Sequence, residues 1–380
     1  MADLIMQRGY HIYGIFDNNP MKWGSEYRGI PILKPNEISR HENAIVLIDI
    51  RFYEAMRSQL RTLGFDGPVI RMIDYNSFSE YSLSDETVAR KRMRLGHGID
   101  IIKSLDEKYG RLFYVFCPFP ALGDVYFTMS YLEYFLKKRD ISKDNVCVLM
   151  SFYAGIDVVR LFDKEIYTEV LNQDDLEAAI QAAIYSDEYR FFIAHQDRPY
   201  VVKLQKILDT KCIPLDLIYR CGVFGLPKDT IPKIPVNWDN YPYLSSIEAD
   251  NTVIISPYAK SVPTMDEKFW AGIVEELQNM GKKLYTNVAG DEKPLSGTEP
   301  IRVRLCEKKS LLEKAGTFIG VRSGLCDIIR SVNCKKIALY PDYYYMGTRW
   351  KAIDMYSIDS FTNIEVTEDI DVKSLIAEQL

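Results

Sequence analysis

The sequence predicts an α/β protein with two Rossmann-like parallel-sheet domains that face a cleft, and a smaller α/β module before them. Short runs rich in β-branched and aromatic residues alternate with helical stretches, which is the pattern of parallel sheets. A polar stretch and the proline-rich stretch "GLPKDTIPKIPVNWDNYPY" divide this alternation into blocks. We therefore expect a truncated module at 1–76, a linker with a helix at 77–99, and sheet domains at 100–245 and 246–380.

The bulk composition is that of an ordinary globular protein. The 380 residues are 47% hydrophobic and 26% charged, and no apolar run is long enough for a membrane helix. The net charge of −6 argues against a nucleic-acid partner, because binding to a phosphate backbone needs excess positive charge. The seven cysteines lack metal-ligand spacing and fit a reducing compartment. We expect a cytoplasmic protein.

The first block reads as an incomplete nucleotide-binding fold. We expect strands in "HIYGIFD", "AIVLIDI" and "PVIRMID", with a helix between the last two. Asp17 ends the first strand, where an acidic residue in a dinucleotide fold binds a ribose hydroxyl. The glycine-rich turn that belongs about 20 residues upstream is missing, and residues 1–9 read as the helix that follows it. The alternative is that Asp17 only caps the "DNNP" turn.

The linker block carries a basic run on a segment that we expect to be helical. "SLSDETV" is a typical helix start, because serine and aspartate suit the N-cap. His97 lies between two glycines, and we expect it in the linker. The basic run forms either a solvated helix face or a peripheral contact with anionic lipid at the inner face of the membrane. Its residues are Arg90, Lys91, Arg92 and Arg94.

The second block places two polar residues at strand ends. Its expected strands are "RLFYVFC", "NVCVLMS", "YTEVL" and "YRFFIAH", and open α/β sheets bind ligands beyond the carboxyl ends of their strands. After the first strand, prolines and a glycine in "CPFPALGD" predict a tight turn before a helix. Asp124 is either an N-cap there or a carboxylate presented to the cleft. His195 ends the last strand and is either part of the acceptor side of the cleft or a satisfied loop histidine.

The third block contains the strands "NTVIISP", "KKLYTNV", "TFIGV" and "KKIALYP", and a helix with clean apolar periodicity in "TMDEKFWAGIVEELQNMG". The strand "TFIGV" delivers Ser323 and Gly324 to a helix N-terminus, where free N–H groups favour a phosphate. Arg322 adds a cation suited to phosphate oxygens. The alternative is an ordinary strand–turn–helix with an exposed arginine.

Two other segments of the third block also follow strands. Tyr258 and Lys260 in "SPYAKS" either contact a donor or pack within a loop. The loop "DYYYMGTRW", which contains Arg349, either closes over a base or sugar or makes an aromatic surface contact. The sequence leaves both pairs of alternatives open.

From about residue 110 to 345, these motifs resemble those of two-domain B-type (GT-B) glycosyltransferases, most of all the heptosyltransferase-like enzymes of bacterial surface-polysaccharide assembly. The Gly-Asp turn of that family aligns with "ALGDVYFTMSYL", which implies that Asp124 is the base on the acceptor hydroxyl. A donor-contacting Lys-x-Trp aligns with "DEKFW" and implies Lys268, and an acidic residue after the next strand implies Glu292. The family's phosphate turn aligns with "RSGLCD" and implies Ser323, Gly324 and Leu325.

The phosphate turn departs from the family at both ends. Arg322 stands where the family has an aspartate, and Asp327, a further candidate for the cleft, stands where it has a histidine. The changed charges leave the donor nucleotide and sugar open and argue against a heptosyltransferase in the strict sense. The first block resembles nucleotide-binding-like modules of polysaccharide-biosynthesis proteins in "GIFDNNPMKWGSEYRGIPIL". We expect a structural or docking role for it.

The resemblance implies an inverting transfer of a sugar from a nucleotide-diphosphate donor to a capsule, cell-wall or lipid-linked glycan acceptor. We expect no cofactor and no metal, since no convincing Asp-x-Asp motif appears and cationic side chains with a helix dipole can stabilise the leaving diphosphate. The clear Asp-x-Asp match, at 369–371, reads as a helix cap. One alternative is a non-catalytic nucleotide-sugar-binding or scaffolding protein, which the altered turn and the incomplete module favour. A nicotinamide-dependent enzyme is disfavoured by the missing glycine turn.

Overall fold

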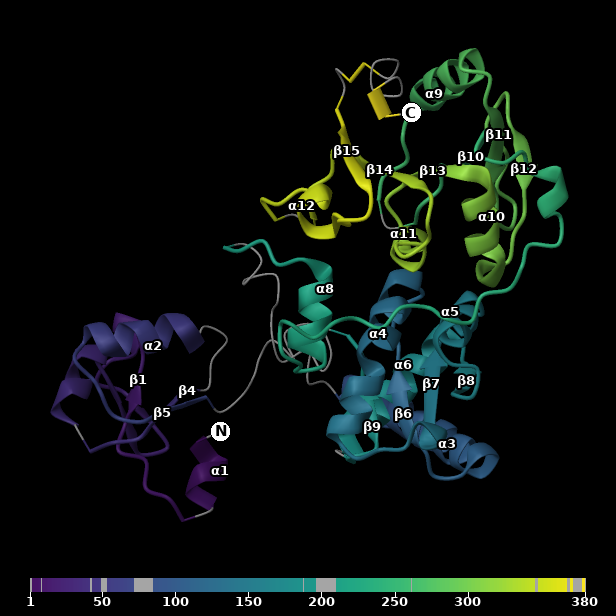
Figure 1. Cartoon of the computed structure of the whole chain (residues 1–380). Coiled ribbons are helices and arrows are strands. Elements are labelled where there is room, and N and C mark those ends of the chain that lie inside the picture. The colour runs from purple at the N-terminus through teal and green to yellow at the C-terminus, as the bar shows by residue number, and fades with distance from the viewer. Residues whose placement is uncertain are drawn as a thin grey trace. The chain divides into compact units, whose positions relative to one another are not determined.

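The computed structural model forms two compact units, residues 1–87 and 88–380, which are described separately (Figure 1). The described residues are 2–7, 9–41, 43–48, 53–71, 85–186, 188–195, 210–260, 262–345, 348–367, 370–371 and 378–379.

The first unit is a small α/β module with two separate sheets. One sheet has the order β1-β3-β2, and the other is the parallel pair β4-β5 with α2 between its strands in sequence. The expected strand at 11–17 is only two residues long, because only Ile15 and Phe16 pair with β3. The elements are α1 (Ala2–Gln7), β1 (Ile15–Phe16), η1 (Pro20–Lys22), β2 (Glu26–Tyr27), β3 (Ile30–Leu33), η2 (Pro35–Arg40), β4 (Val46–Ile48), α2 (Tyr53–Thr62) and β5 (Val69–Arg71).

Asp17 forms a turn in this module. Its carboxylate accepts hydrogen bonds from the Asn19 backbone N–H at 2.8 Å and from Lys22 Nζ at 2.7 Å. These two bonds, the one from Lys22 first, lower the pKa of Asp17. The contacts are those of an aspartate that caps its own turn, so they support the alternative reading of Asp17 over the ribose reading.

The second unit begins with a four-stranded parallel sheet of order β8-β7-β6-β9. The strands β6 and β7 are fully buried, as their uninterrupted apolar runs predict. All four strands occupy the predicted segments. The elements are α3 (Asp85–Tyr109), β6 (Phe113–Phe116), α4 (Leu122–Lys138), η3 (Lys143–Asn145), β7 (Val146–Met150), α5 (Ala154–Phe162), β8 (Tyr167–Val170), α6 (Gln173–Ser186) and β9 (Phe191–Ile193).

The placement of His97 in a linker is wrong. Residues 85–109 form one continuous helix, α3, and His97 Nε2 lies 2.6 Å from Asp175 Oδ1 on α6. Gly98 is one of the two glycines beside His97, and a Cβ at this position would overlap the Ala178 carbonyl. The glycine therefore permits close packing of α3 on α6 rather than breaking the helix.

The second sheet has six parallel strands in the order β12-β11-β10-β13-β14-β15. The four predicted strands form its centre, and the unpredicted strands β12 and β15 form its edges. Trp270, Ile273 and Leu277 of α9 pack in its core. The elements are β10 (Thr252–Ser256), α9 (Glu267–Asn279), β11 (Lys283–Asn287), β12 (Glu299–Ile301), η6 (Leu305–Glu307), α10 (Lys308–Ala315), β13 (Gly316–Val321), α11 (Gly324–Ile328), β14 (Lys335–Pro341), α12 (Ala352–Tyr356) and β15 (Thr362–Val366).

The two sheets of the second unit are joined by a short helical segment and by the proline-rich stretch. The former consists of α8 (Leu215–Leu217) and a π-helix, η4 (Ile218–Val223). Residues 225–243 contain no helix, as predicted, and cross from Ser130 to Cys306 through backbone hydrogen bonds. The two sheet domains also contact each other through helices, because α11 packs on α4 and Ile328 of α11 belongs to the core around α4 (Figure 1).

Candidate active site

Asp124 lies in the first turn of α4, at the carboxyl edge of the first sheet. The buried strand β6 ends at Phe116, and the turn that follows delivers the chain to the helix. The N-cap residue is Ala121, so the reading of Asp124 as the N-cap is wrong. Its side chain is 20% exposed and lies near the positive end of the helix dipole, which favours the ionised carboxylate.

Two side chains from distant parts of the sequence meet the Asp124 carboxylate. The Tyr219 hydroxyl donates a hydrogen bond to Oδ1 at 2.5 Å. His195 Nε2 lies 3.6 Å from the same oxygen, and its ring packs on Phe119 with centroids 4.5 Å apart. The structure thus brings the predicted residues Asp124 and His195 together and adds Tyr219, which the sequence did not indicate.

Tyr219 is held by the π-helix η4. This helix contains the wide bond from the Phe224 N–H to the Tyr219 carbonyl at 3.0 Å, and such turns are frequent at functional sites. The ring is fully buried and stacks on Phe127. Burial, together with the neighbouring Asp124 charge, raises the pKa of Tyr219 well above 10. The phenol is therefore a hydrogen-bond donor throughout the physiological pH range.

The turn after β13 holds a buried ion pair. Arg322 Nη2 donates to Asp327 Oδ1 at 2.7 Å, and Nε donates to the Tyr356 carbonyl at 2.8 Å. Nη1 donates to the Ser323 carbonyl. The Arg322 side chain is only 6% exposed, so the alternative of an exposed arginine is wrong. The two residues that depart from the family pattern pair with each other.

Two glycines allow this turn to meet the first turn of α4. A Cβ on Gly324 would lie 2.5 Å from the Gly123 backbone nitrogen and 2.9 Å from Leu122 Cβ. A Cβ on Gly123 would lie 3.1 Å from Asp327 Oδ2. The Asp327 carboxylate therefore reaches the helix start that carries Asp124. The predicted residues Asp124, Gly324 and Asp327 converge on one place between the two sheets.

Other predicted donor residues lie at the carboxyl edge of the second sheet. The Tyr258 hydroxyl donates to the Lys293 carbonyl at 2.5 Å, and Glu292 Oε2 accepts the Ala289 N–H at 2.8 Å. The bond from Tyr258 joins the loops after β10 and β11, and the bond to Glu292 lies within the loop after β11. Lys260 and Lys268 are exposed. Asp266 is the N-cap of α9 and accepts the Lys268 backbone N–H at 2.9 Å.

Three of the predicted ligand-binding residues make contacts that stabilise the local structure of the chain. Leu325 is buried in the core of the second sheet, so its side chain is not presented to a ligand. Ser323 is the N-cap residue of α11. Arg349 donates to the Thr210 carbonyl at 2.9 Å and stacks on Trp350, which ties its loop to the segment before α8.

The basic run lies on α3. Arg90 and Arg92 are exposed, and Arg94 lies 3.9 Å from Glu177. No helix among the described residues is long and apolar enough to cross a membrane. The described residues hold no group of three or more histidine, cysteine, aspartate or glutamate side chains suited to a metal ion. The Asp-x-Asp match includes residue 369, which lies outside the described residues.

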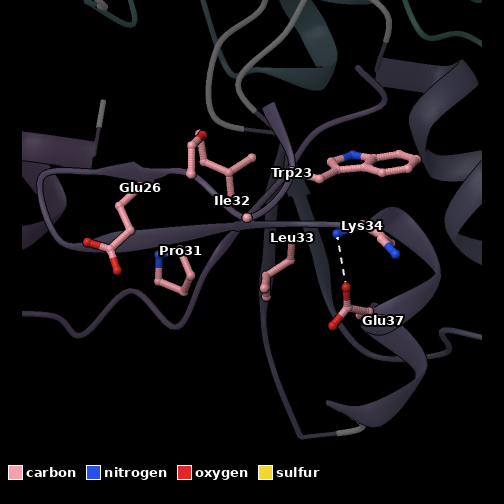
Figure 2. A pocket seen from close by; sticks show the side chains of 9 residues that line it. Trp23, Glu26, Pro31, Ile32, Leu33, Lys34 and Glu37 are labelled. Atoms are coloured by element: carbon pink, nitrogen blue, oxygen red, sulfur yellow. Dashed lines mark hydrogen bonds between the residues drawn. The ribbon is translucent and has the colours of Figure 1, made fainter. Parts of the chain in front are cut away.

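A separate pocket of about 310 Å³ lies on the first unit (Figure 2). Trp23, Lys34 and Glu37 line it, together with the strand residues Pro31 and Leu33. The Lys34 ammonium lies 5.6 Å from the centre of the Trp23 ring, and the Lys34 backbone N–H donates to Glu37 at 3.3 Å. The module thus presents a small mixed polar and aromatic surface of its own.

The fold is similar to those of solved glycosyltransferases, although the sequence matches no family profile and no curated protein. E. coli ADP-heptose LPS heptosyltransferase II aligns over 70% of this chain and 96% of its own, at 11% identity and a TM-score of 0.50. A glycosyl transferase family 9 protein from Veillonella parvula aligns over 67% and 84%, at 14% identity and a TM-score of 0.46. TibC, an iron-containing dodecameric glycosyltransferase from enterotoxigenic E. coli, aligns over 68% of this chain, at 14% identity and a TM-score of 0.43.

The likeness to heptosyltransferase II shows a GT-B fold. It covers nearly all of that enzyme, and both parallel sheets of the second unit agree with the two-domain architecture. The predicted fold class is confirmed. The chain spans only 64% of the length of TibC.

Proposed function

We propose that this chain is a glycosyltransferase that moves a sugar from a nucleotide-diphosphate donor to a hydroxyl of a surface-polysaccharide or glycolipid acceptor, with inversion. One observation carries the proposal. A partly exposed carboxylate, Asp124, lies at the carboxyl edge of a parallel sheet and is oriented by Tyr219 and His195. A positioned carboxylate of this kind suits general base catalysis.

In the proposed reaction the acceptor oxygen attacks the anomeric carbon of the sugar. Its proton passes to Asp124, the new glycosidic C–O bond forms, and the bond from the sugar to the diphosphate breaks. Tyr219 keeps the carboxylate in place by its hydrogen bond to Oδ1. We assign the leaving diphosphate to Lys268 and the 323–325 turn, which Arg322 fixes by its bond to the Ser323 carbonyl.

A non-catalytic scaffolding or nucleotide-sugar-binding protein is the second candidate. The observation that favours it is the ion pair between Arg322 and Asp327. A guanidinium that neutralises an internal carboxylate has less charge to offer a diphosphate. For a scaffolding protein, the GT-B fold would serve the assembly of other proteins, and the first module with its pocket would serve as a docking unit.

The deciding experiment combines binding with turnover. UDP, GDP and ADP are titrated into the full chain, and nucleotide release from the matching sugar conjugates is then measured for the wild type and for Asp124→Asn. We expect Asp124→Asn to reduce release by about 10²- to 10⁴-fold while the nucleotide affinity stays within about twofold. The matched control is Glu133→Gln, an exposed carboxylate farther along α4, which should change neither quantity.

Two outcomes contradict the proposal. Undiminished release by Asp124→Asn would place the base elsewhere. Nucleotide binding without any release by the wild type, even with candidate acceptors added, would favour the scaffold.

A further inference from the structure

Lys308 is a buried lysine at the carboxyl edge of the second sheet. It begins α10 and is only 8% exposed, although its place in "EKKS" reads as a solvated helix start. Lysine is rarely this buried unless it is paired with an opposite charge or used for function. Its surroundings therefore indicate what it does.

A chain of polar side chains connects Lys308 to the ends of two neighbouring strands. Its ammonium donates to Asn287 Oδ1 at 2.6 Å, and Asn287 Nδ2 lies 3.2 Å from Ser256 Oγ. Ser256 and Asn287 are the last residues of the adjacent parallel strands β10 and β11. Open α/β sheets bind ligands beyond this edge of their strands.

The Lys308 ammonium has hydrogen-bonding capacity to spare. It carries three N–H donors, and among the described residues Asn287 is its one hydrogen-bond acceptor. Two carboxylates lie close enough to influence it, but Glu307 binds Arg304 and Glu292 accepts the Ala289 N–H. Burial lowers the pKa of Lys308 to about 8, against the opposing effect of Glu307 and Glu292. A buried donor without an acceptor is unfavourable, so the site suits an incoming acceptor.

The local charges select the kind of acceptor. Glu292 and Glu307 disfavour a further anion beside Lys308, so a phosphate group is a poor fit. A neutral carbonyl oxygen is a good fit for the spare N–H groups, and lysine pairs with such oxygens on guanine. Adenine presents an amino group instead of a carbonyl oxygen. The neighbouring Glu292 suits a ribose hydroxyl.

We propose that Lys308, Asn287 and Ser256 bind the nucleoside of the donor, and that Lys308 donates to a carbonyl oxygen of its base. This inference rests on the proposed function and adds a substrate class to it. Donors with a uracil or guanine base are preferred over donors with adenine.

Isothermal titration of UDP, GDP and ADP tests this inference. The proteins are the wild type, Lys308→Met and the control Lys314→Met, which removes an exposed lysine from the same helix. We expect UDP or GDP to bind the wild type at least tenfold more tightly than ADP. Lys308→Met should weaken the preferred nucleotide by about 10- to 100-fold and ADP much less, as expected for a lost bond to a charged donor. Lys314→Met should match the wild type.

A second readout needs no substitution. Lys308 loses its charge as the pH rises through about 8, so the preference of the wild type for UDP or GDP over ADP should shrink between pH 7 and pH 9. The inference is overturned if nucleotides bind while Lys308→Met keeps the wild-type affinities, or if ADP binds most tightly; the transferase proposal survives both results. Absence of nucleotide binding to the wild type would overturn both proposals.

Discussion

The turns after β6 and β13 are alike in local structure, but the carboxylates that follow them differ in exposure and in hydrogen-bond partners. Each strand is followed by a short turn that opens a helix, and each helix has a glycine in its first turn. On α4, Asp124 is 20% exposed and receives a hydrogen bond from Tyr219. On α11, Asp327 is 3% exposed and is paired with Arg322 at 2.7 Å.

The difference shows that a local motif sets the place of a charged group, whereas the side chains packed around that group set its availability. Asp124 is oriented by a tyrosine 95 residues away in the chain. Asp327 is neutralised by an arginine five residues away. The first carboxylate is the base of the proposed reaction, while the second is buried in an ion pair on α11, the helix that packs on α4.

The largest effect is expected from breaking the buried pair. Arg322→Met leaves the Asp327 carboxylate buried and uncompensated, which should lower the free energy of unfolding by about 3–5 kcal/mol. Asp124→Asn should change it by less than about 1 kcal/mol, because asparagine still accepts the Tyr219 hydrogen bond. Urea unfolding followed by tryptophan fluorescence measures both.

The double variant Arg322→Met/Asp327→Leu serves as the control for the pair. It removes both charges and should recover most of the lost stability. If Arg322→Met alone lowers the free energy of unfolding by less than about 1 kcal/mol, the ion pair does not stabilise the fold.

The contact between the two turns is the next most sensitive feature. Gly324→Ala places a Cβ 2.5 Å from the Gly123 backbone nitrogen, which should lower the free energy of unfolding by about 1–3 kcal/mol. Gly96→Ala on α3 meets no atom within 4 Å and should be neutral or stabilising by up to about 1 kcal/mol. Equal stabilities of the two variants in urea unfolding would show that α4 and α11 do not pack closely.

Lys308 is a further buried charged residue, and among the described residues it forms no ion pair. Its pKa is about 8 in the folded chain and 10.5 ordinarily, so the unfolded chain binds more protons between these values. Wild-type stability should therefore rise from pH 8 to pH 10.5. Lys308→Met should be about 1–2 kcal/mol more stable than the wild type at pH 7, with the gain vanishing near pH 10.

Urea unfolding across this pH range checks the prediction for Lys308. A Lys308→Met variant that is less stable than the wild type at pH 7 would assign the lysine a structural role instead.

The sequence predicts the central strands of both large sheets and the position of Asp124, because buried parallel strands appear as uninterrupted apolar runs. It also places His195 at the end of β9, which explains why the two residues meet. The edge strands β12 and β15 escape prediction. Two of the three residues of β12 are a glutamate and a proline, and the segment owes its strand form to pairing with β11.

Three parts of the site could not be predicted from the sequence, and each has a physical reason. Tyr219 lies on a short π-helix, and its contact with Asp124 joins residues 95 positions apart in the chain. The pairing of Arg322 with Asp327 depends on side-chain burial rather than on motif spacing. Lys308 stands beside a second lysine, and only the folded chain shows that one of the two is buried.

The pH–rate profile of Tyr219→Phe tests most directly whether a distant residue makes Asp124 a working base. The Tyr219 hydroxyl donates to the carboxylate and stabilises its ionised form, so its removal should move the acid limb of nucleotide release to higher pH. The rate on the plateau should fall less than in Asp124→Asn. An acid limb that stays at the wild-type pH would contradict the account, because the carboxylate that Tyr219 holds would then not be the group that takes the proton.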